Sequence, residues 1–190
     1  MARDQANAEF EHYSGVARFF HWVTVVFVFG LLGSGLVMVY RGKDLNIWDG
    51  LTNSLYASHK TAGIALLVIV VLRLVYRLVR RAPADEPTLH VFHRVASHAT
   101  HWTLYALLVA LPLIGWYGVS LFPALNILGG YNIPALVAPD QAASKQVLWL
   151  HGLLAYVLIA LIAMHIGAAL YHHAIRRDNV LRRMIPSLKR

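Results

Sequence analysis

Apolar residues dominate four long segments of the chain, which are separated by shorter polar stretches. The segments lie near residues 17–40, 56–79, 98–122 and 147–173. Each can cross a hydrocarbon layer of about 30 Å, which takes roughly 20 helical residues. Lipid offers no water to backbone groups, and no alternation of apolar and polar residues indicates a barrel. The pattern predicts an all-α membrane protein, with residues 1–190 forming one transmembrane four-helix bundle.

The composition agrees with a membrane protein. Hydrophobic residues make up 58% of the chain and charged residues 14%, against about 25% charged in soluble domains. There is no cysteine, which excludes disulfides, thiolate-bound iron–sulfur clusters and the C-x-x-C-H attachment of a c-type haem. Residues 1–14 are polar and lack a short apolar core with a cleavage site, so we expect no removable signal peptide.

The basic residues are unevenly divided between the two sides of the bundle. Of the 17 Lys and Arg, only Arg41, Lys43, Lys60 and Lys145 fall on the side of the first and third connections. The positive-inside rule therefore predicts that both termini are cytoplasmic. A net charge of +8 could also suit nucleic acid, but the basic residues adjoin span ends, as topology anchors do. We expect lipid, and no nucleic acid, as the partner of this charge.

Two histidines in the fourth span lie fourteen residues apart, His151 and His165. At 1.5 Å per residue this is about 21 Å along a helix, and just under four turns, so both rings project from nearly the same face. An imidazole in lipid is costly unless it has a partner. The helix thus offers two histidines at two depths of the bundle interior.

Other spans offer a histidine at each of these depths. His21 begins the first span at the depth of His165, which gives an inner pair, and His59 begins the second span at the depth of His151, which gives an outer pair. Opposed imidazoles supply both axial positions of a flat macrocycle, so the pairs predict two haem b groups. A hydrogen bond to a backbone carbonyl is the ordinary alternative for each histidine.

Two arginines follow His59 on the second span. Arg73 lies fourteen residues after it, on the same face at the inner level, and Arg77 lies one turn further in. A guanidinium can bind a haem propionate in a bidentate way. The alternative is that both side chains extend to the inner membrane surface.

Further residues have more than one interpretation. His98 and His101 open the third span near the inner surface; they could replace His21 as ligands, or line a proton or quinone site. Gly33 and Gly35 on the first span could clear room beside the outer haem, or serve ordinary helix packing.

The chain resembles the bacterial cytochrome b561 family of four-helix, di-haem membrane proteins over roughly residues 14–186. The resemblance is carried by His151, His165 and four stretches: RFFHWVTVVF (18–27), SHKTAGIALLVIVVLRLVYRL (58–78), ALPLIGW (110–116) and HHAIRRDNVLRRMIP (172–186). It implies bis-histidine ligation by His21, His59, His151 and His165, a bacterial inner-membrane location and electron exchange with quinone. One branch of the family oxidises superoxide and reduces ubiquinone.

Filled axial positions leave no site for a substrate on the iron, which favours electron transfer at the haem edge. The sequence thus predicts a transmembrane b-type cytochrome, and superoxide or an unidentified redox protein as donor at the weakly positive outer face. One alternative is the haem-bearing membrane subunit of a dehydrogenase or hydrogenase. Another is a divalent-metal transporter, against which all nine Asp and Glu lie outside the apolar spans.

Overall fold

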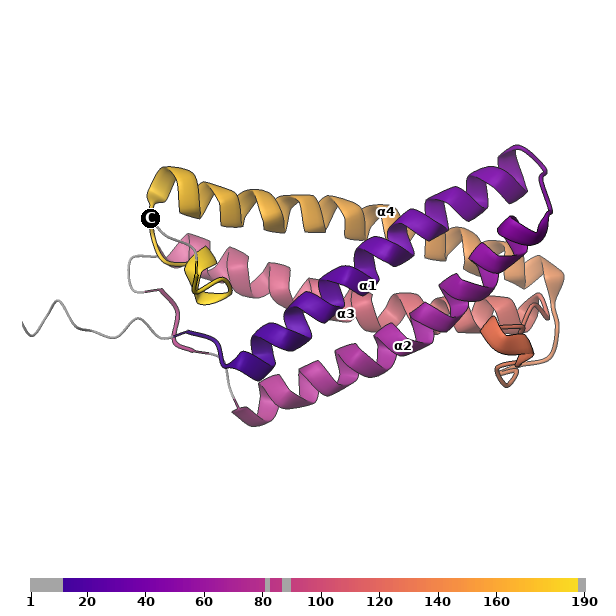
Figure 1. The fold of residues 1–190 in the computed structure, drawn as a ribbon, viewed down its shortest axis with the longest axis horizontal. Helices are drawn as coiled ribbons and strands as arrows, with labels where there is room; N and C mark the ends of the chain where they lie inside the picture. Colours follow the sequence, from indigo (N-terminus) through magenta and orange to yellow (C-terminus); the bar gives the residue numbers. More distant parts are fainter. Residues whose placement is uncertain (1–11, 81–82, 87–89, 188–190) are drawn as a thin grey trace, which may run out of the picture.

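The computed structural model describes residues 12–80, 83–86 and 90–187. Four long helices run back and forth (Figure 1), and each is long and apolar enough to cross a membrane. The described residues contain no β-strand, only an isolated bridge between Asn126 and Asn132. The predicted all-α bundle is confirmed, with helices α1 (Gly15–Val39), α2 (Gly50–Arg80), α3 (Val91–Leu121) and α4 (Gln141–Tyr171).

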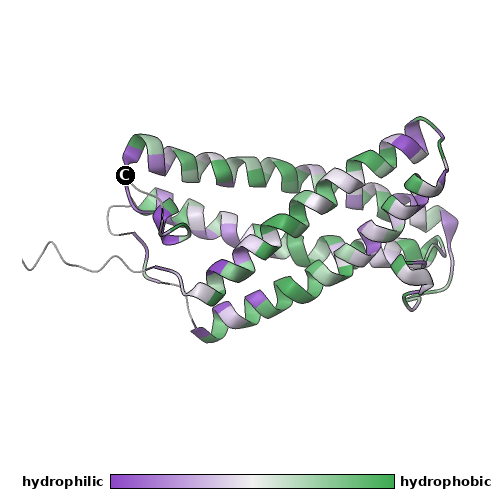
Figure 2. Cartoon of the chain, viewed as in Figure 1, coloured by the Kyte–Doolittle hydropathy of each residue, from purple (hydrophilic) through white to green (hydrophobic). Residues whose placement is uncertain are grey.

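Three of the helices begin earlier than the apolar spans predicted. The predicted starts were near 56, 98 and 147, whereas α2, α3 and α4 begin at Gly50, Val91 and Gln141. Polar residues before these starts provide caps; Asp140 Oδ1, for example, accepts the N–H groups of Ala142 and Ala143 at 3.0 Å. Hydropathy marks the hydrocarbon depth rather than the helix end, and the polar residues gather toward the ends of the bundle (Figure 2).

The helices pack in sequence order, α1 on α2, α2 on α3 and α3 on α4. Among the described residues, the backbone of α4 approaches α1 and α2 far less closely. A buried cluster at mid-height joins the helices, while many large apolar side chains face outward, as lipid contact requires. The buried cluster comprises Val28, Leu66, Val70, Tyr105, Leu108, Leu111 and Leu158.

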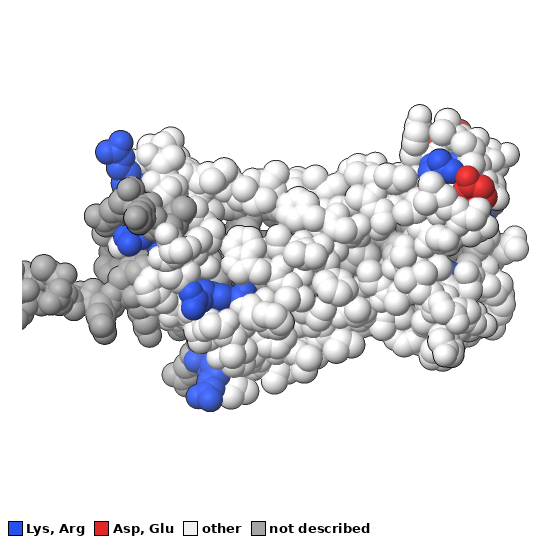
Figure 3. Space-filling view, in the orientation of Figure 1, with Lys and Arg blue, Asp and Glu red and all other residues white. Residues whose placement is uncertain are grey.

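We call the end at which residues 12 and 187 lie the inner end, and the opposite end the outer end, in line with the orientation expected from the charges. Short helices occupy both ends: η2 (Tyr40–Asp44) and η3 (Leu128–Gly130) at the outer end, η4 (His172–Arg176) and η5 (Leu181–Arg183) at the inner end. Charged side chains flank a largely uncharged middle (Figure 3). Residues 1–11, 81 and 188–190, which entered the charge-based orientation, lie outside the described residues.

The connection between α3 and α4 is fixed to the outer ends of α2 and α3. The Lys60 ammonium donates to the Ala124 carbonyl at 2.7 Å and to Asn126 Oδ1 at 2.9 Å. Trp116 Nε1 donates to the Pro134 carbonyl at 2.9 Å. Lys60 therefore has a structural role in addition to its charge.

Candidate functional site

The structure brings the four predicted histidines together in the two expected pairs. In the outer pair the ring centres of His59 and His151 are 6.3 Å apart with an interplanar angle of 77°. In the inner pair the ring centres of His21 and His165 are 6.5 Å apart with an angle of 62°. Helix α4 contributes to both pairs, and α1 and α2 contribute the partners. The backbone of α4 is not in close contact with that of α1 or α2, so the imidazoles are what brings α4 next to these two helices at both levels.

The ring separations fit a metal held between two imidazoles. A metal–imidazole bond is about 2.0–2.1 Å long, and a five-membered ring with bonds of about 1.33 Å places its nitrogen roughly 1.1 Å from the ring centre. Two such bonds in line separate the ring centres by roughly 6.2–6.4 Å. The observed 6.3 and 6.5 Å agree with this value. Both pairs therefore suit the two axial positions of a haem iron.

Hydrogen bonds hold the outer pair in the tautomer that ligation through Nε2 needs. His151 Nδ1 lies 3.1 Å from the Leu111 carbonyl on α3, and because a carbonyl can only accept, Nδ1 carries the proton. His59 Nδ1 lies 3.2 Å from Ser34 Oγ on α1, and that hydroxyl donates to the Leu31 carbonyl at 3.2 Å. With the hydroxyl proton directed to this carbonyl, the Ser34 oxygen accepts a hydrogen bond from His59 Nδ1–H. Both Nε2 atoms keep their lone pairs for a metal.

Each ring of the outer pair lies against a glycine of the neighbouring helix. A Cβ at Gly35 would lie 3.1 Å from His59 Cε1, and a Cβ at Gly115 would lie 3.2 Å from His151 Cε1. Such distances are tighter than ordinary van der Waals contact, so a larger residue would push the ring. At Gly33 a Cβ would meet nothing within 4 Å. Of the two glycines predicted beside the outer site, only Gly35 contacts a histidine.

The inner pair has a different environment. Arg73 NH2 lies 3.1 Å from His21 Nδ1, and because a guanidinium can only donate, Nδ1 accepts this hydrogen bond. In this arrangement the ring proton of His21 is on Nε2. The inner pair is therefore at the right separation, but His21 is not in the tautomer that binds a metal through Nε2.

The guanidinium groups of Arg73 and Arg77 lie near the inner pair, and among the described residues no carboxylate pairs with either of them. The guanidinium carbons of Arg73 and Arg77 lie 5.2 and 5.4 Å from the centre of the Tyr105 ring, and that of Arg77 lies 5.5 Å from the Trp102 ring. Aromatic faces compensate a cation only partly. The pair of charges suits a ligand with two carboxylates, such as haem, and the structure places Arg73 at the inner level as expected.

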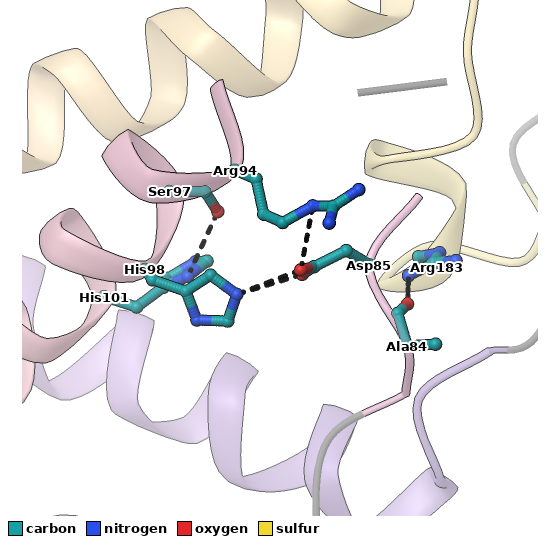
Figure 4. A network of polar contacts seen from close by, with 7 residues as sticks. All are labelled: Ala84, Asp85, Arg94, Ser97, His98, His101 and Arg183. Atoms are coloured by element: carbon teal, nitrogen blue, oxygen red, sulfur yellow. Dashed lines mark hydrogen bonds and ion pairs between the residues drawn. The ribbon is translucent and has the colours of Figure 1, made fainter. Parts of the chain in front are cut away.

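His101 and His98 form a polar group next to the inner pair (Figure 4). The ring centre of His101 is 5.4 Å from that of His165, shorter than in-line ligation of one iron requires. Ser97 Oγ lies 3.4 Å from His101 Nδ1. One turn nearer the surface, His98 Nε2 lies 3.1 Å from both Asp85 oxygens. Arg94 Nε contacts one of these oxygens, Oδ2, at 3.3 Å. This geometry favours His21 as the partner of His165.

Four contributors were not found from the sequence. Ser34, the Leu111 carbonyl and Tyr105 contact residues of the two pairs or their arginines, and Gly115 lies against His151. Ser34 is a polar residue within an apolar span, which is a usable signal. The position of a backbone carbonyl cannot be recognised from the sequence, and Tyr105 has no feature that distinguishes it from other aromatic residues of a core.

Fold and site together define a class of protein: a helical membrane bundle with two opposed histidine pairs at two depths. The sequence profile described as prokaryotic cytochrome b561 matches residues 12–187. "Cytochrome b561 homolog 2" of Escherichia coli (strain K12) is 32% identical over 177 residues, covering 92% of both chains. "Cytochrome b561 homolog 1" of the same organism is 29% identical, covering 93% of this chain and 98% of the relative.

A third relative carries a more specific name. "Probable superoxide oxidase CybB" of Yersinia pestis is 27% identical over 166 residues, covering 87% of this chain and 91% of its own length. With the profile covering almost the whole chain, the protein belongs to the prokaryotic cytochrome b561 family. It is thus a membrane b-type cytochrome whose cofactor is haem b.

Proposed function

We propose that this chain carries two haem b groups, the outer one between His59 and His151 and the inner one between His21 and His165, and conducts electrons between an outer-face donor and the quinone pool. The observation that carries the proposal is the pair of ring separations, 6.3 and 6.5 Å, which match bis-imidazole ligation. Each haem iron, when bound, supplies a one-electron Fe(III)/Fe(II) couple. With two imidazoles on each iron, donors and acceptors would exchange electrons without binding the metal.

The inner site requires one rearrangement of protein groups. The Arg73 guanidinium donates to His21 Nδ1, and it would turn to a haem propionate, because a carboxylate is a stronger partner for a guanidinium than a neutral ring nitrogen. His21 Nδ1 would then carry the ring proton and leave the Nε2 lone pair for the metal. Arg77, on the faces of Tyr105 and Trp102, adds a second positive charge. Arg73 and Arg77 thus act as propionate partners.

The donor we propose is superoxide, oxidised at the outer face. Two superoxide anions give two O2 and two electrons, which with two protons reduce one quinone to quinol. Lys60 and the exposed Lys145 supply positive charge at the outer end, which attracts a small anion. Arg41 contributes less, because Asp49 pairs with it at 2.6 Å. The name of the Yersinia relative supports the same donor.

Single histidine replacements test the haem assignment. In purified protein, His59→Ala and His151→Ala should each remove the outer haem and leave the inner one. His21→Ala and His165→Ala should do the reverse, with haem content measured as the pyridine haemochrome per chain. His173→Ala, a histidine outside both pairs, is the matched control and should keep two haems. Two haems retained in any of the four variants would contradict the ligand set.

Charge neutralisation tests the donor. Lys60→Gln and Lys145→Gln should slow haem reduction by a superoxide-generating system, and the loss should shrink as ionic strength rises, because salt screens attraction between exposed charges. Lys145 is the cleaner probe, because Lys60 also binds the Ala124 carbonyl. An unchanged rate and an unchanged salt dependence in both variants would exclude electrostatic attraction of superoxide.

A further inference from the structure

We propose that Ser34 is a positioning residue for the outer haem, holding His59 in the ligating tautomer and lowering the reduction potential of that haem relative to a chain without the hydroxyl. The inference rests on the proposed function, since it needs a haem between His59 and His151. The Ser34 hydroxyl lies on α1 and would act on the haem only through the imidazole ring of His59.

A continuous chain of hydrogen bonds runs from the His59 ring through the Ser34 hydroxyl to the Leu31 carbonyl. Ser34 Oγ lies 3.2 Å from His59 Nδ1 and 3.2 Å from the Leu31 carbonyl. The hydroxyl has one proton, and when this proton points to the carbonyl, which can only accept, the oxygen lone pair faces the imidazole N–H. In this arrangement His59 donates through Nδ1 and presents Nε2 to the partner histidine.

The other histidine of the outer pair, His151, has a similar environment. That ring donates its Nδ1–H to the Leu111 carbonyl at 3.1 Å and lies against Gly115. His59 lies against Gly35, directly after Ser34 in the chain. The same arrangement, an Nδ1 acceptor beside a glycine on the adjacent helix, therefore occurs on both sides of the outer site. On the α3 side the acceptor is backbone. On the α1 side it is the Ser34 hydroxyl, a side chain that can be removed, and the Leu31 carbonyl behind this hydroxyl also hydrogen-bonds His59.

The hydrogen bond that a histidine ligand makes affects the reduction potential of the haem iron. An imidazole that donates its N–H to an acceptor becomes a more basic ligand. A more basic ligand stabilises Fe(III) over Fe(II), which lowers the reduction potential. Among the described residues, the Ser34 hydroxyl contacts His59 of the outer pair and neither histidine of the inner pair. We therefore expect the outer haem, and not the inner one, to depend on Ser34.

Potentiometric titration of the purified holoprotein tests this inference. The outer haem is first assigned as the component missing in His151→Ala. Ser34→Ala should then raise the outer midpoint potential by about 59 mV, which is a tenfold change in the ratio of oxidised to reduced haem at fixed potential, and leave the inner midpoint unchanged. Ser34→Thr keeps the hydroxyl and should restore the outer value.

Ser58→Ala is the matched control, because the Ser58 hydroxyl also donates to the carbonyl three residues earlier, at 3.0 Å, and contacts no histidine. Loss of the outer haem in Ser34→Ala, with full occupancy in Ser34→Thr and Ser58→Ala, would also support the positioning role. An unchanged outer midpoint in Ser34→Ala, or an equal shift in Ser58→Ala, would overturn it. If His151→Ala contained as much haem as the wild-type protein, the proposed function itself would be refuted.

Discussion

At the scale of single residues, the two histidine pairs differ in what holds their rings. In the outer pair both Nδ1 atoms donate to the neighbouring helix and both rings lie against glycine. In the inner pair His21 accepts from Arg73. The outer site is thus prepared for ligation by protein groups alone, whereas the inner site depends on where the Arg73 guanidinium lies.

Gly115→Ala should weaken outer haem binding. Its Cβ would lie 3.2 and 3.3 Å from Cε1 and Nδ1 of His151, so the ring must move and its bond to the Leu111 carbonyl must lengthen. The measurement is haem content, together with the outer midpoint potential. Gly152→Ala is the control on α4, where a Cβ meets nothing within 4 Å; it should keep both haems and stabilise the helix by about 0.5–1 kcal/mol. Equal haem occupancy in both variants would show that the glycine contact is unimportant.

Arg73→Gln should lower the midpoint potential of the inner haem. A nearby positive charge stabilises the reduced iron, and at an effective dielectric constant of about 20 such a charge contributes on the order of 1 kcal/mol. Redox titration measures the effect, with Arg80→Gln at the exposed end of α2 as the control. If the midpoint potential of the inner haem were unchanged in Arg73→Gln, Arg73 would not interact with that haem.

Spacing was enough to predict which histidines meet. The fourteen-residue interval between His151 and His165 fixes a common helix face, and the alternating direction of the spans fixes the depth of His21 and His59. The hydrogen-bond partners were beyond prediction. They depend on a neighbouring helix lying close enough for Ser34 and the Leu111 carbonyl to reach a ring, which helix–helix packing determines and spacing along one helix does not.

At the scale of elements, a compact polar turn connects α1 to α2. Asp49 Oδ1 accepts the Thr52 N–H at 2.9 Å, its Oδ2 pairs with Arg41 at 2.6 Å, and Arg41 Nε donates to Thr52 Oγ1 at 3.1 Å. The backbone and side-chain hydrogen bonds from Thr52, followed by the Arg41 guanidinium, lower the pKa of Asp49 from 3.8 to about 2. The carboxylate is favoured in the folded chain, so it supports the start of α2 in its ionised form.

The stability supplied by Asp49 should depend on pH. Because the folded pKa lies below the unfolded value, the contribution is complete above about pH 4 and is lost as pH falls through about 2. Asp49→Asn keeps an acceptor for the Thr52 N–H but does not titrate. Thermal unfolding in detergent should therefore favour wild type over Asp49→Asn at neutral pH, with a difference that closes toward pH 2. A constant difference from pH 7 to pH 2 would contradict this account.

The number and order of the helices were predictable, and their starts were not. Each apolar run is long enough to identify a span, but α2, α3 and α4 extend beyond the runs at their N-termini. The added turns begin at caps such as Asp140, and their polar residues look like loop when hydropathy alone is considered. Local capping, rather than the apolar pattern, sets these boundaries.

At the scale of the whole molecule, charge separates the two ends of the bundle. Basic residues predominate toward the inner end, where Arg176, Arg182 and Arg183 lie in or beside short helices. The C-terminal segment is fixed there, because Arg183 pairs with Glu86 and its carbonyl accepts the Tyr13 N–H. By the positive-inside rule we propose that this end faces the cytoplasm.

Cysteine labelling can test that orientation, because the chain has no cysteine of its own. Asn132→Cys places a thiol in the exposed outer connection, and Ser187→Cys places one at the exposed inner end. In intact cells a membrane-impermeant maleimide should label Asn132→Cys and leave Ser187→Cys unlabelled until the membrane is disrupted. The reverse pattern would invert the assignment of inner and outer ends.

We propose that two haems lie between opposed imidazoles at two depths of one bundle. Electron paramagnetic resonance of the oxidised, purified protein, combined with haem quantification on the same sample, measures both the number of haems and their ligation. We expect two haem b per chain and two low-spin ferric signals typical of bis-histidine ligation. A single haem per chain, or a high-spin signal from an iron with an open axial position, would contradict it.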